Sequence, residues 1–286
     1  MPSQRIGILH PGEMGISVAA ALKNNGHSVY WVSEGRSADT RARAEKFGLA
    51  DVHTLTQLCA ECSMIVSVCP PHAAETIAHQ VMAAGFKGLY LDANAISPKR
   101  AIAIGQVLGD AGIALVDGAI IGAPAWKPGG TWLYLSGARA NEIAACFADS
   151  PFATRVLSTN LGEASALKMC YSAYSKGTTA LLSAILATAE TWGVREALDD
   201  QWAEGDANFA TRTQERVRGS LGKAWRFVGE MEEISATFSD AGMPGGFHAA
   251  AANIYRRLAR FKDARPAPTL NEVLDALRQP EDQPHR

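Results

Sequence analysis

The chain of 286 residues lacks both a strong charge of one sign and a long apolar run. Its formal net charge is −2, so we expect neither nucleic acid nor a membrane as its main partner. The most apolar stretch, residues 178–189, is shorter than the ~18–20 residues that a membrane span needs. Hydrophobic residues make up 47% and charged residues 20% of the chain. This composition predicts a soluble globular protein.

Cysteine is scarce and follows no disulfide pattern. The five cysteines are odd in number and scattered, which is typical of a reducing compartment. Cys59 and Cys62 form a C-x-x-C pair, but the pair ends a predicted short helix, and no second pair completes a zinc site. The N-terminus runs directly into the first predicted strand and leaves no room for a signal peptide. We therefore expect a cytoplasmic protein without a metal site.

The most informative segment is a strand, residues 5–9, that turns tightly into a helix. Backbone N–H groups at the start of such a helix bind the pyrophosphate of a dinucleotide, provided that no side chain blocks the approach. Gly12 would allow this approach, and Gly15 would let the helix pack on the strand. His10 stands at the first glycine of the usual G-x-G-x-x-G, so the fingerprint is degenerate. We favour a nucleotide cofactor over a purely structural turn because the segment opens a βαβ pattern.

The first 157 residues alternate predicted strands and helices, whereas the remainder shows only helical periodicity. The predicted strands are residues 5–9, 28–33, 64–69, 89–93, 114–117, 131–136 and 154–157. Such alternation is typical of a doubly wound, largely parallel sheet. The predicted helices of the second half are residues 163–192, 206–217, 224–241, 247–261 and 270–277. The sequence therefore predicts a Rossmann-type α/β domain over residues 1–160 and an all-α domain over residues 161–286.

A polar seam runs along the first helix of the second half. Its members recur at steps of three and four, which places them on one helical face: Ser165, Lys168, Tyr171, Ser172, Ser175, Lys176 and Thr179. A lysine on an otherwise apolar helix is costly to bury unless a partner or substrate uses its charge. A solvated stripe is the alternative interpretation. We favour a site because Lys168 follows a dinucleotide domain and can face the nicotinamide from the domain cleft.

Together these motifs resemble the β-hydroxyacid dehydrogenases, a family related to 6-phosphogluconate dehydrogenases and imine reductases. The family's cofactor loop G-x-G-x-M-G corresponds to residues 10–15, and its D-x-S-T-x-S-P segment to residues 92–98. Its D-A-P-V-S-G-G substrate loop is echoed by residues 117–123. The helix G-x-x-x-x-x-K-x-x-N-N, which carries the catalytic lysine of the family, matches residues 162–172. The C-terminal helices look like those of a divergent branch.

The resemblance implies hydride transfer between a nicotinamide and a carbonyl or alcohol carbon of a small-molecule substrate. Lys168 is then the catalytic residue, which exchanges a proton with the substrate oxygen or stabilises an alkoxide. The implied substrate-binding residues are Asn94, Gly122, Ala123, Tyr171 and Ser172. The implied cofactor-binding residues are His10, Pro11, Gly12, Glu13, Met14, Ser33, Glu34, Arg36, Cys69, Pro70 and Asn94.

The departures from the family pattern fall in the substrate pocket. Ile121 replaces a serine that helps to hold a substrate carboxylate, and Tyr171 replaces the first asparagine beside the lysine. Glu230 stands where the family usually has aspartate, and the lysine before it is a glycine. We therefore expect a larger or less anionic substrate. The alternatives are an imine reductase-like enzyme, in which aspartate or tyrosine usually replaces Lys168, and a dinucleotide-binding scaffold without catalysis.

The cofactor choice and the assembly state rest on two further patterns. An NAD site places an acidic residue at the end of the second strand, where this chain has Ser33. Arg36, with Ser37 and Arg41, can receive a 2′-phosphate, which predicts NADP. Glu34 keeps NAD as the alternative, because a shift of one residue restores the carboxylate. The apolar circumference of residues 178–189, in a region through which the family pairs its subunits, predicts a homodimer.

Overall fold

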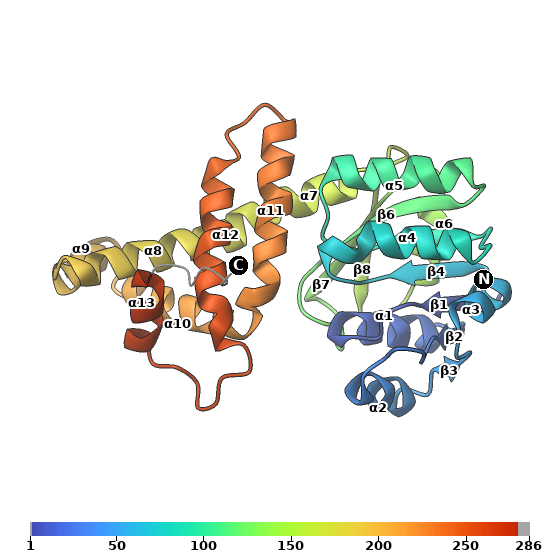
Figure 1. Cartoon of the computed structure of the whole chain (residues 1–286), viewed down its shortest axis with the longest axis horizontal. Coiled ribbons are helices and arrows are strands. Elements are labelled where there is room, and N and C mark those ends of the chain that lie inside the picture. Colours follow the sequence, from blue (N-terminus) through green and yellow to red (C-terminus); the bar gives the residue numbers. More distant parts are fainter. Residues whose placement is uncertain (1, 280–286) are drawn as a thin grey trace, which may run out of the picture. The chain divides into compact units, whose positions relative to one another are not determined.

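The computed structural model describes residues 2–279 (Figure 1). Contacts between Cα atoms divide the chain into two compact units between Met169 and Cys170. The predicted domain boundary after residue 160 lies just before helix α7 (Glu163–Ser172), whereas this division falls within that helix.

The N-terminal unit contains one sheet of eight strands in the order β3-β2-β1-β4-β5-β6-β7-β8. The strands are β1 (Arg5–Ile8), β2 (Ser28–Trp31), β3 (Ala50–Asp51), β4 (Met64–Ser67), β5 (Leu89–Asp92), β6 (Ala114–Ile121), β7 (Thr131–Ser136) and β8 (Phe152–Ser158). Every neighbouring pair is parallel except β6 and β7, which are antiparallel. The predicted α/β fold with a largely parallel sheet is confirmed. The sequence pattern misses β3 because its two residues are exposed and show no apolar alternation.

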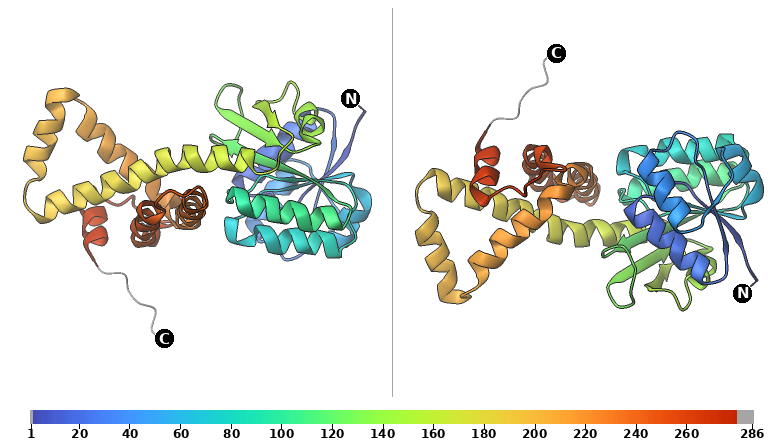
Figure 2. Two further views of the ribbon diagram at one scale, coloured as in Figure 1. Left: turned by 90° about the horizontal axis from the view of Figure 1, so that it is seen from above. Right: turned by 90° about the horizontal axis from the view of Figure 1, so that it is seen from below.

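Helices cover both faces of this sheet (Figures 1 and 2). They are α1 (Glu13–Asn24), α2 (Ala38–Lys46), α3 (Leu55–Glu61), α4 (Ala74–Ala83), α5 (Pro98–Asp110) and α6 (Ala140–Cys146), with one 3₁₀ turn, η1 (Pro71–Ala73). Buried side chains of α1, α2 and α6 form one core layer with the strands, and those of α3, α4 and α5 form the other. Two covered faces explain why the central strands are almost continuously apolar.

The chain reverses its direction of travel across the sheet between β1 and β4. From β1 it proceeds to β2 and β3 on one side, and then crosses to β4 on the other side of β1. In open α/β sheets, ligands bind outside the carboxyl ends of the strands at such a switch point. The turn after β1 contains the predicted cofactor loop, so topology and sequence motif coincide.

Among its described residues, the C-terminal unit contains helices and connecting loops but no strand. After the end of α7 come the π-helical turn η2 (Ala173–Gly177), α8 (Thr178–Thr191), α9 (Arg195–Gly205), α10 (Phe209–Ser220), η3 (Leu221–Lys223), α11 (Ala224–Asp240), α12 (Gly246–Leu258), η4 (Ala259–Phe261) and α13 (Leu270–Arg278). The capping box of Thr269 and Glu272 starts α13. The sequence pattern misses α9, because none of its residues is buried and its apolar residues form no core-facing stripe. Within residues 2–279, no helix is long and apolar enough to span a membrane.

Candidate active site

The two glycines of the first turn have different structural roles. Gly12 immediately precedes α1, and a Cβ atom at this position would meet no atom within 4 Å. A Cβ at Gly15 would overlap the carbonyl oxygen of His10. That carbonyl also accepts a hydrogen bond from the Gly12 N–H at 2.8 Å. Gly15 therefore allows the tight turn itself, whereas Gly12 leaves the N-terminus of α1 open to a ligand.

A cavity of about 190 Å³ lies beside this turn. Its lining residues follow β1 and β2 or belong to α3 and α4: Leu9, His10, Val32, Glu34, Arg36, Leu55, Ile77 and Gln80. Four of the lining residues are aliphatic, and four polar or charged residues from separate elements also border the space. This combination is typical of a small-molecule site, here at the switch point of the sheet.

Two buried polar atoms of the cavity residues have no hydrogen-bond partner among the described residues, namely His10 Nδ1 and Arg36 Nε. Burial and the charge of Arg36 lower the pKa of His10 to about 4, so its imidazole is neutral near pH 7. Buried polar atoms in native proteins are almost always paired, so these two atoms suit a ligand that supplies hydrogen-bonding groups. The nucleoside part of a dinucleotide has such groups and an apolar ring face, and it fits the lining of the cavity.

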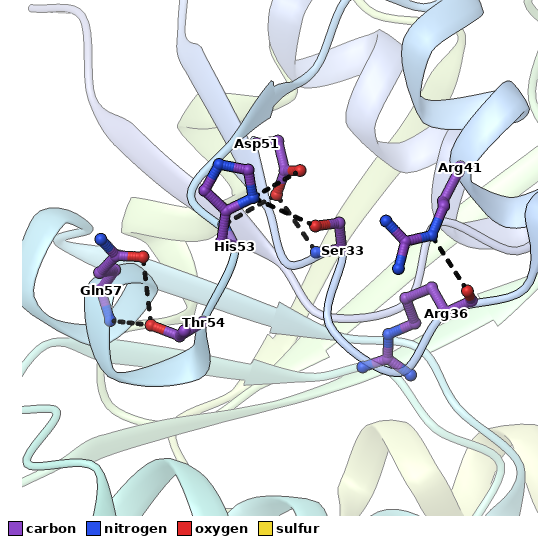
Figure 3. A network of polar contacts seen from close by, with 7 residues as sticks. All are labelled: Ser33, Arg36, Arg41, Asp51, His53, Thr54 and Gln57. Carbon is purple, nitrogen blue, oxygen red and sulfur yellow. Dashed lines mark hydrogen bonds and ion pairs between the residues drawn. The ribbon is translucent and has the colours of Figure 1, made fainter.

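A polar network joins Ser33, which follows β2, to Asp51 and His53 (Figure 3). Asp51 Oδ1 accepts hydrogen bonds from the N–H groups of Ser33 at 3.2 Å and His53 at 2.8 Å. Its Oδ2 lies 3.2 Å from His53 Nδ1. Arg36 and Arg41 lie on the other side of Ser33, and Arg41 Nε donates to the Arg36 carbonyl at 3.2 Å. The Asp51 carboxylate is thus hydrogen-bonded within the protein.

Asn94 joins the ends of two neighbouring strands. It follows β5 and is buried, and its Oδ1 accepts a hydrogen bond from the Cys69 N–H at 2.6 Å. Its Nδ2 donates to Ser67 Oγ at 3.2 Å. Burial raises the pKa of the Cys69 thiol to about 12, so this thiol stays protonated. Asn94 therefore holds the Cys69–Pro70 turn in place, and its predicted contact with the cofactor and substrate stays a prediction.

Lys168 lies on α7 and reaches the end of strand β6. Its Nζ donates a hydrogen bond to the Ile120 carbonyl at 3.2 Å. Two residues later, Gly122 has φ +131, and a Cβ there would overlap the Gly130 carbonyl oxygen. The Ala123 carbonyl accepts from Thr131 Oγ1 at 2.5 Å, which closes this turn. The structure thus places Lys168 beside the strand that leads into the predicted substrate loop.

The predicted substrate residues of the C-terminal unit differ in exposure. Tyr171 is 51% exposed, whereas Ser172 is buried. Lys176 Nζ lies 2.5 Å from Glu230 Oε2 and donates to Ser172 Oγ at 3.3 Å. Glu230 was not expected as the partner of Lys176, because the pair spans two helical segments that are far apart in the sequence.

Side chains from other helices donate hydrogen bonds to the π turn that contains Lys176. A π turn leaves carbonyl groups without the usual partner of an α-helix, and such turns occur often at functional sites. Arg216 Nη2 donates to the Ser175 carbonyl at 2.6 Å, and the Tyr255 hydroxyl donates to the Lys176 carbonyl at 2.8 Å. Both donors belong to the C-terminal unit, so the irregular turn is a stable part of its packing.

The C-x-x-C pair has no chemical feature of a redox site. Cys59 and Cys62 are both buried. Burial raises the pKa of Cys59 to about 11 and that of Cys62 to about 12, so both thiols are protonated and unreactive near neutral pH. Within residues 2–279, no group of three histidine, cysteine or acidic residues is arranged to hold a metal ion.

Comparison with known proteins identifies the family. Residues 5–147 match the NAD binding domain of 6-phosphogluconate dehydrogenase, and residues 189–258 match a domain of unknown function, DUF1932. The first match covers half of the 286 residues. The chain therefore belongs to the family of proteins that carry the 6-phosphogluconate dehydrogenase NAD binding domain, and the predicted resemblance is confirmed. An NAD(P)-binding domain is thus present.

Individual relatives agree with this assignment. An uncharacterised 28.5 kDa protein of Methanothermus fervidus is 28% identical over 231 residues, which cover 80% of this chain and 89% of that protein. The solved structure of a conserved protein of unknown function is described as similar to 3-hydroxyacid dehydrogenases. Its match to this chain has 27% identity and a TM-score of 0.67, and it covers 90% of this chain and 97% of that protein. The Mycobacterium tuberculosis 3-hydroxyisobutyrate dehydrogenase has a TM-score of 0.70 at 18% identity, over 97% of this chain and 100% of its own. The last likeness shows a shared fold.

Proposed function

We propose that the protein is an NAD(P)-dependent oxidoreductase that transfers hydride between the nicotinamide and a carbonyl or hydroxyl carbon, with Lys168 as the proton-transfer group. The observation that carries this proposal is the position of the Lys168 ammonium at the end of β6, in a chain whose residues 5–147 match an NAD binding domain. When bound, the cofactor supplies or accepts the hydride. A lysine ammonium next to the substrate oxygen donates or accepts the matching proton and stabilises negative charge on that oxygen.

The other residues act in binding and orientation. The open N-terminus of α1, at Gly12, receives the pyrophosphate through backbone N–H groups. The cavity with His10 and Arg36 receives the nucleoside. Asn94 fixes the Cys69–Pro70 turn at the carboxyl ends of β4 and β5, where the nicotinamide half is expected. Tyr171 and Ser172 follow Lys168 on the same helix, and we assign them to the substrate.

The substrate is proposed to be larger or less anionic than the small β-hydroxy acids of the family. Lys176, the next lysine along the helical run, is paired with Glu230, so its charge is already compensated. Ile121, at the position of a carboxylate-binding serine in the family pattern, ends β6 and has no hydrogen-bonding side chain. Both features argue against a strongly anionic substrate group near them.

We favour NADP over NAD as the cofactor. Asp51 already accepts hydrogen bonds from Ser33 and His53, which reduces its capacity to bind ribose hydroxyls. Arg36 lines the cavity, and its buried Nε has no hydrogen-bond partner among residues 2–279, which suits a 2′-phosphate. Glu34 lines the same cavity and is the residue on which an NAD preference would depend. Replacing Arg36 by alanine should lower kcat/KM for NADPH by roughly 10–100-fold with little change for NADH, since bonds to charged groups contribute ~1.5–3 kcal/mol.

We also propose a homodimer formed through the C-terminal helices. Large apolar side chains are exposed on and near α8, with Tyr174 at 70%, Leu181 at 44% and Trp192 at 77%. Such side chains in one region are typical of a protein interface. Sedimentation at micromolar concentration should give the mass of two chains. A monomer under these conditions contradicts this assembly.

The test of the proposed activity is turnover with a panel of ketones, alcohols and imines, each with NADPH and with NADH. Oxidation of the reduced cofactor by a carbonyl substrate supports the proposal. Tight dinucleotide binding without turnover by any panel member would instead indicate a binding scaffold. Turnover of imines alone, retained after Lys168→Ala, would assign the proton donor to Tyr171 and indicate an imine reductase-like activity.

A further inference from the structure

Asp117 lies in β6, where its buried carboxylate accepts four hydrogen bonds. Its Oδ1 accepts from the Ser165 hydroxyl at 2.6 Å, and its Oδ2 accepts from the N–H groups of Ser165 at 3.0 Å and Gly162 at 3.1 Å. The fourth donor is Ser136 Oγ of β7, at 3.0 Å. Three of the four donors come from the start of α7. The carboxylate of a strand therefore caps this helix.

The start of α7 depends on these acceptors from the sheet. Gly162, the residue before the helix, has φ +94 and no side chain that could act as a cap. The next buried N–H, that of Ala164, is bonded to Ser136 Oγ at 3.1 Å. Unpaired N–H groups at a buried helix end are costly, and a negative charge there also interacts favourably with the helix dipole. The partners lie 28 to 48 residues away in the sequence.

We propose that Asp117 is a positioning residue for Lys168, an inference that rests on the proposed role of Lys168 in proton transfer. Ser165 and Lys168 are three positions apart on α7 and share a helical face. Ser165 is bonded to Asp117, and Lys168 is bonded to Ile120, three residues further along the same strand. Strand β6 thus holds the helix at its first turn and the lysine one turn later.

The charge of Asp117 is maintained by its neighbour. Asp92 lies opposite Asp117 in the register of β5 and β6, and both are buried. Two adjacent buried carboxyl groups cannot both ionise at low cost. Four donors stabilise the ionised form of Asp117, whereas Asp92 Oδ2 has no partner among residues 2–279. Of the two groups, Asp92 therefore holds a proton more readily, and the charge that caps α7 lies on Asp117.

Two substitutions weaken this attachment to different degrees. Asp117→Asn turns one acceptor into a donor that faces other donors, which loosens the first turn of α7. We expect kcat to fall by roughly 10–100-fold, because a displacement of about 1 Å at a catalytic group has effects of this size. Ser165→Ala removes one hydrogen bond and should lower kcat by roughly 3–10-fold. The dissociation constant for the reduced cofactor should change by less than about threefold in both, since the cofactor loop lies on β1.

A double-mutant cycle separates positioning from a general loss of structure. If Asp117 acts through Lys168, Asp117→Asn should cost less than about twofold in kcat when introduced into Lys168→Ala. The matched control is Ser183→Ala, which removes another buried serine hydroxyl, bonded to the Thr179 carbonyl at 2.8 Å. This control should leave kcat within about twofold, as expected for a neutral hydrogen bond remote from the chemistry. Equal losses in the presence and absence of Lys168 would overturn the proposal.

A second measurement does not require activity. In the wild-type protein, Asp117→Asn and Ser165→Ala, the rate of acetylation of individual lysines by acetic anhydride is followed by peptide mass spectrometry. We expect Lys168 to react several-fold faster in both variants. Lys23, bonded to the Phe47 and Gly48 carbonyls in another part of the same unit, should be unchanged. Unchanged labelling of Lys168 overturns the inference, whereas faster labelling in a protein without turnover upholds it and rejects only the proposed function.

Discussion

Two lysines eight residues apart make different contacts. The ammonium of Lys168 donates to a neutral main-chain carbonyl, that of Ile120. The ammonium of Lys176 is 2.5 Å from the Glu230 carboxylate and lies over the Phe227 ring. The charge of Lys176 is matched by a carboxylate and is thus compensated within the protein. The position of a lysine on a helical face therefore does not by itself decide whether it takes part in catalysis.

The largest expected effect separates the two lysines by catalysis. Lys168→Ala should lower kcat by roughly 10²–10⁴-fold, the usual contribution of a positioned acid or base. Cofactor affinity should be almost unchanged, because the pyrophosphate contacts belong to the Gly12 turn. Steady-state kinetics and fluorescence titration with the reduced cofactor measure the two effects. Lys46→Ala, at an exposed helix end, is the control and should keep full activity. Normal turnover by Lys168→Ala removes the lysine from the mechanism.

The second prediction separates the lysines by stability. Glu230→Gln leaves the half-buried Lys176 without its counter-charge and should lower the free energy of unfolding by about 3 kcal/mol. Replacing both residues by methionine should recover most of this loss, because an ion pair that is largely out of water gains little over apolar packing. Denaturant unfolding of the single and double variants checks this. A double variant as unstable as the single one argues against the compensated-pair interpretation.

A third prediction compares the two glycines of the first turn, of which Gly12 has open space around its Cα and Gly15 does not. Gly12→Ala adds a methyl group in open space and should leave the melting temperature nearly unchanged. It should weaken dinucleotide binding by more than about tenfold, because the new Cβ would lie where the pyrophosphate approaches. Gly15→Ala should weaken binding and also destabilise the fold, because its Cβ overlaps the His10 carbonyl oxygen. Thermal unfolding with and without cofactor distinguishes the two. Equal binding by Gly12→Ala and wild type rejects the pyrophosphate assignment.

The smallest expected effect concerns Asp92. Burial, followed by the charge of Asp117, raises its pKa from 3.8 to about 7 in the folded state. The folded protein therefore holds a proton that the unfolded chain releases, and this contribution to stability is full below pH ~4 and is lost as the pH rises through ~7. Asp92→Asn should not show this loss. Relative to wild type, it should gain on the order of 1–2 kcal/mol in unfolding free energy between pH 6 and pH 8. A difference in unfolding free energy between Asp92→Asn and wild type that does not vary with pH would contradict this prediction.

Local patterns were sufficient for the fold class and for several candidate residues. The strand–turn–helix around Gly12, the alternation of the first half and the helical second half are written in runs of neighbouring residues. Such runs report on periodicity and turn chemistry, which act over a few positions. The helical face with Lys168 and Ser172 was predicted in the same way. Strand β3 and helix α9 were missed because neither carries an apolar periodicity.

The sequence by itself thus determined that the chain forms a dinucleotide-type sheet followed by helices, and that a lysine lies on the first of these helices. Only the tertiary structure decided what surrounds each polar group. The bonds of Asp117 to α7 span 45 and 48 residues, and the contact of Lys176 with Glu230 spans 54. The pairing of Asp92 with Asp117 depends on strand register. Hydrogen bonds and charges act through space, and folding alone brings residues so distant along the chain within their range.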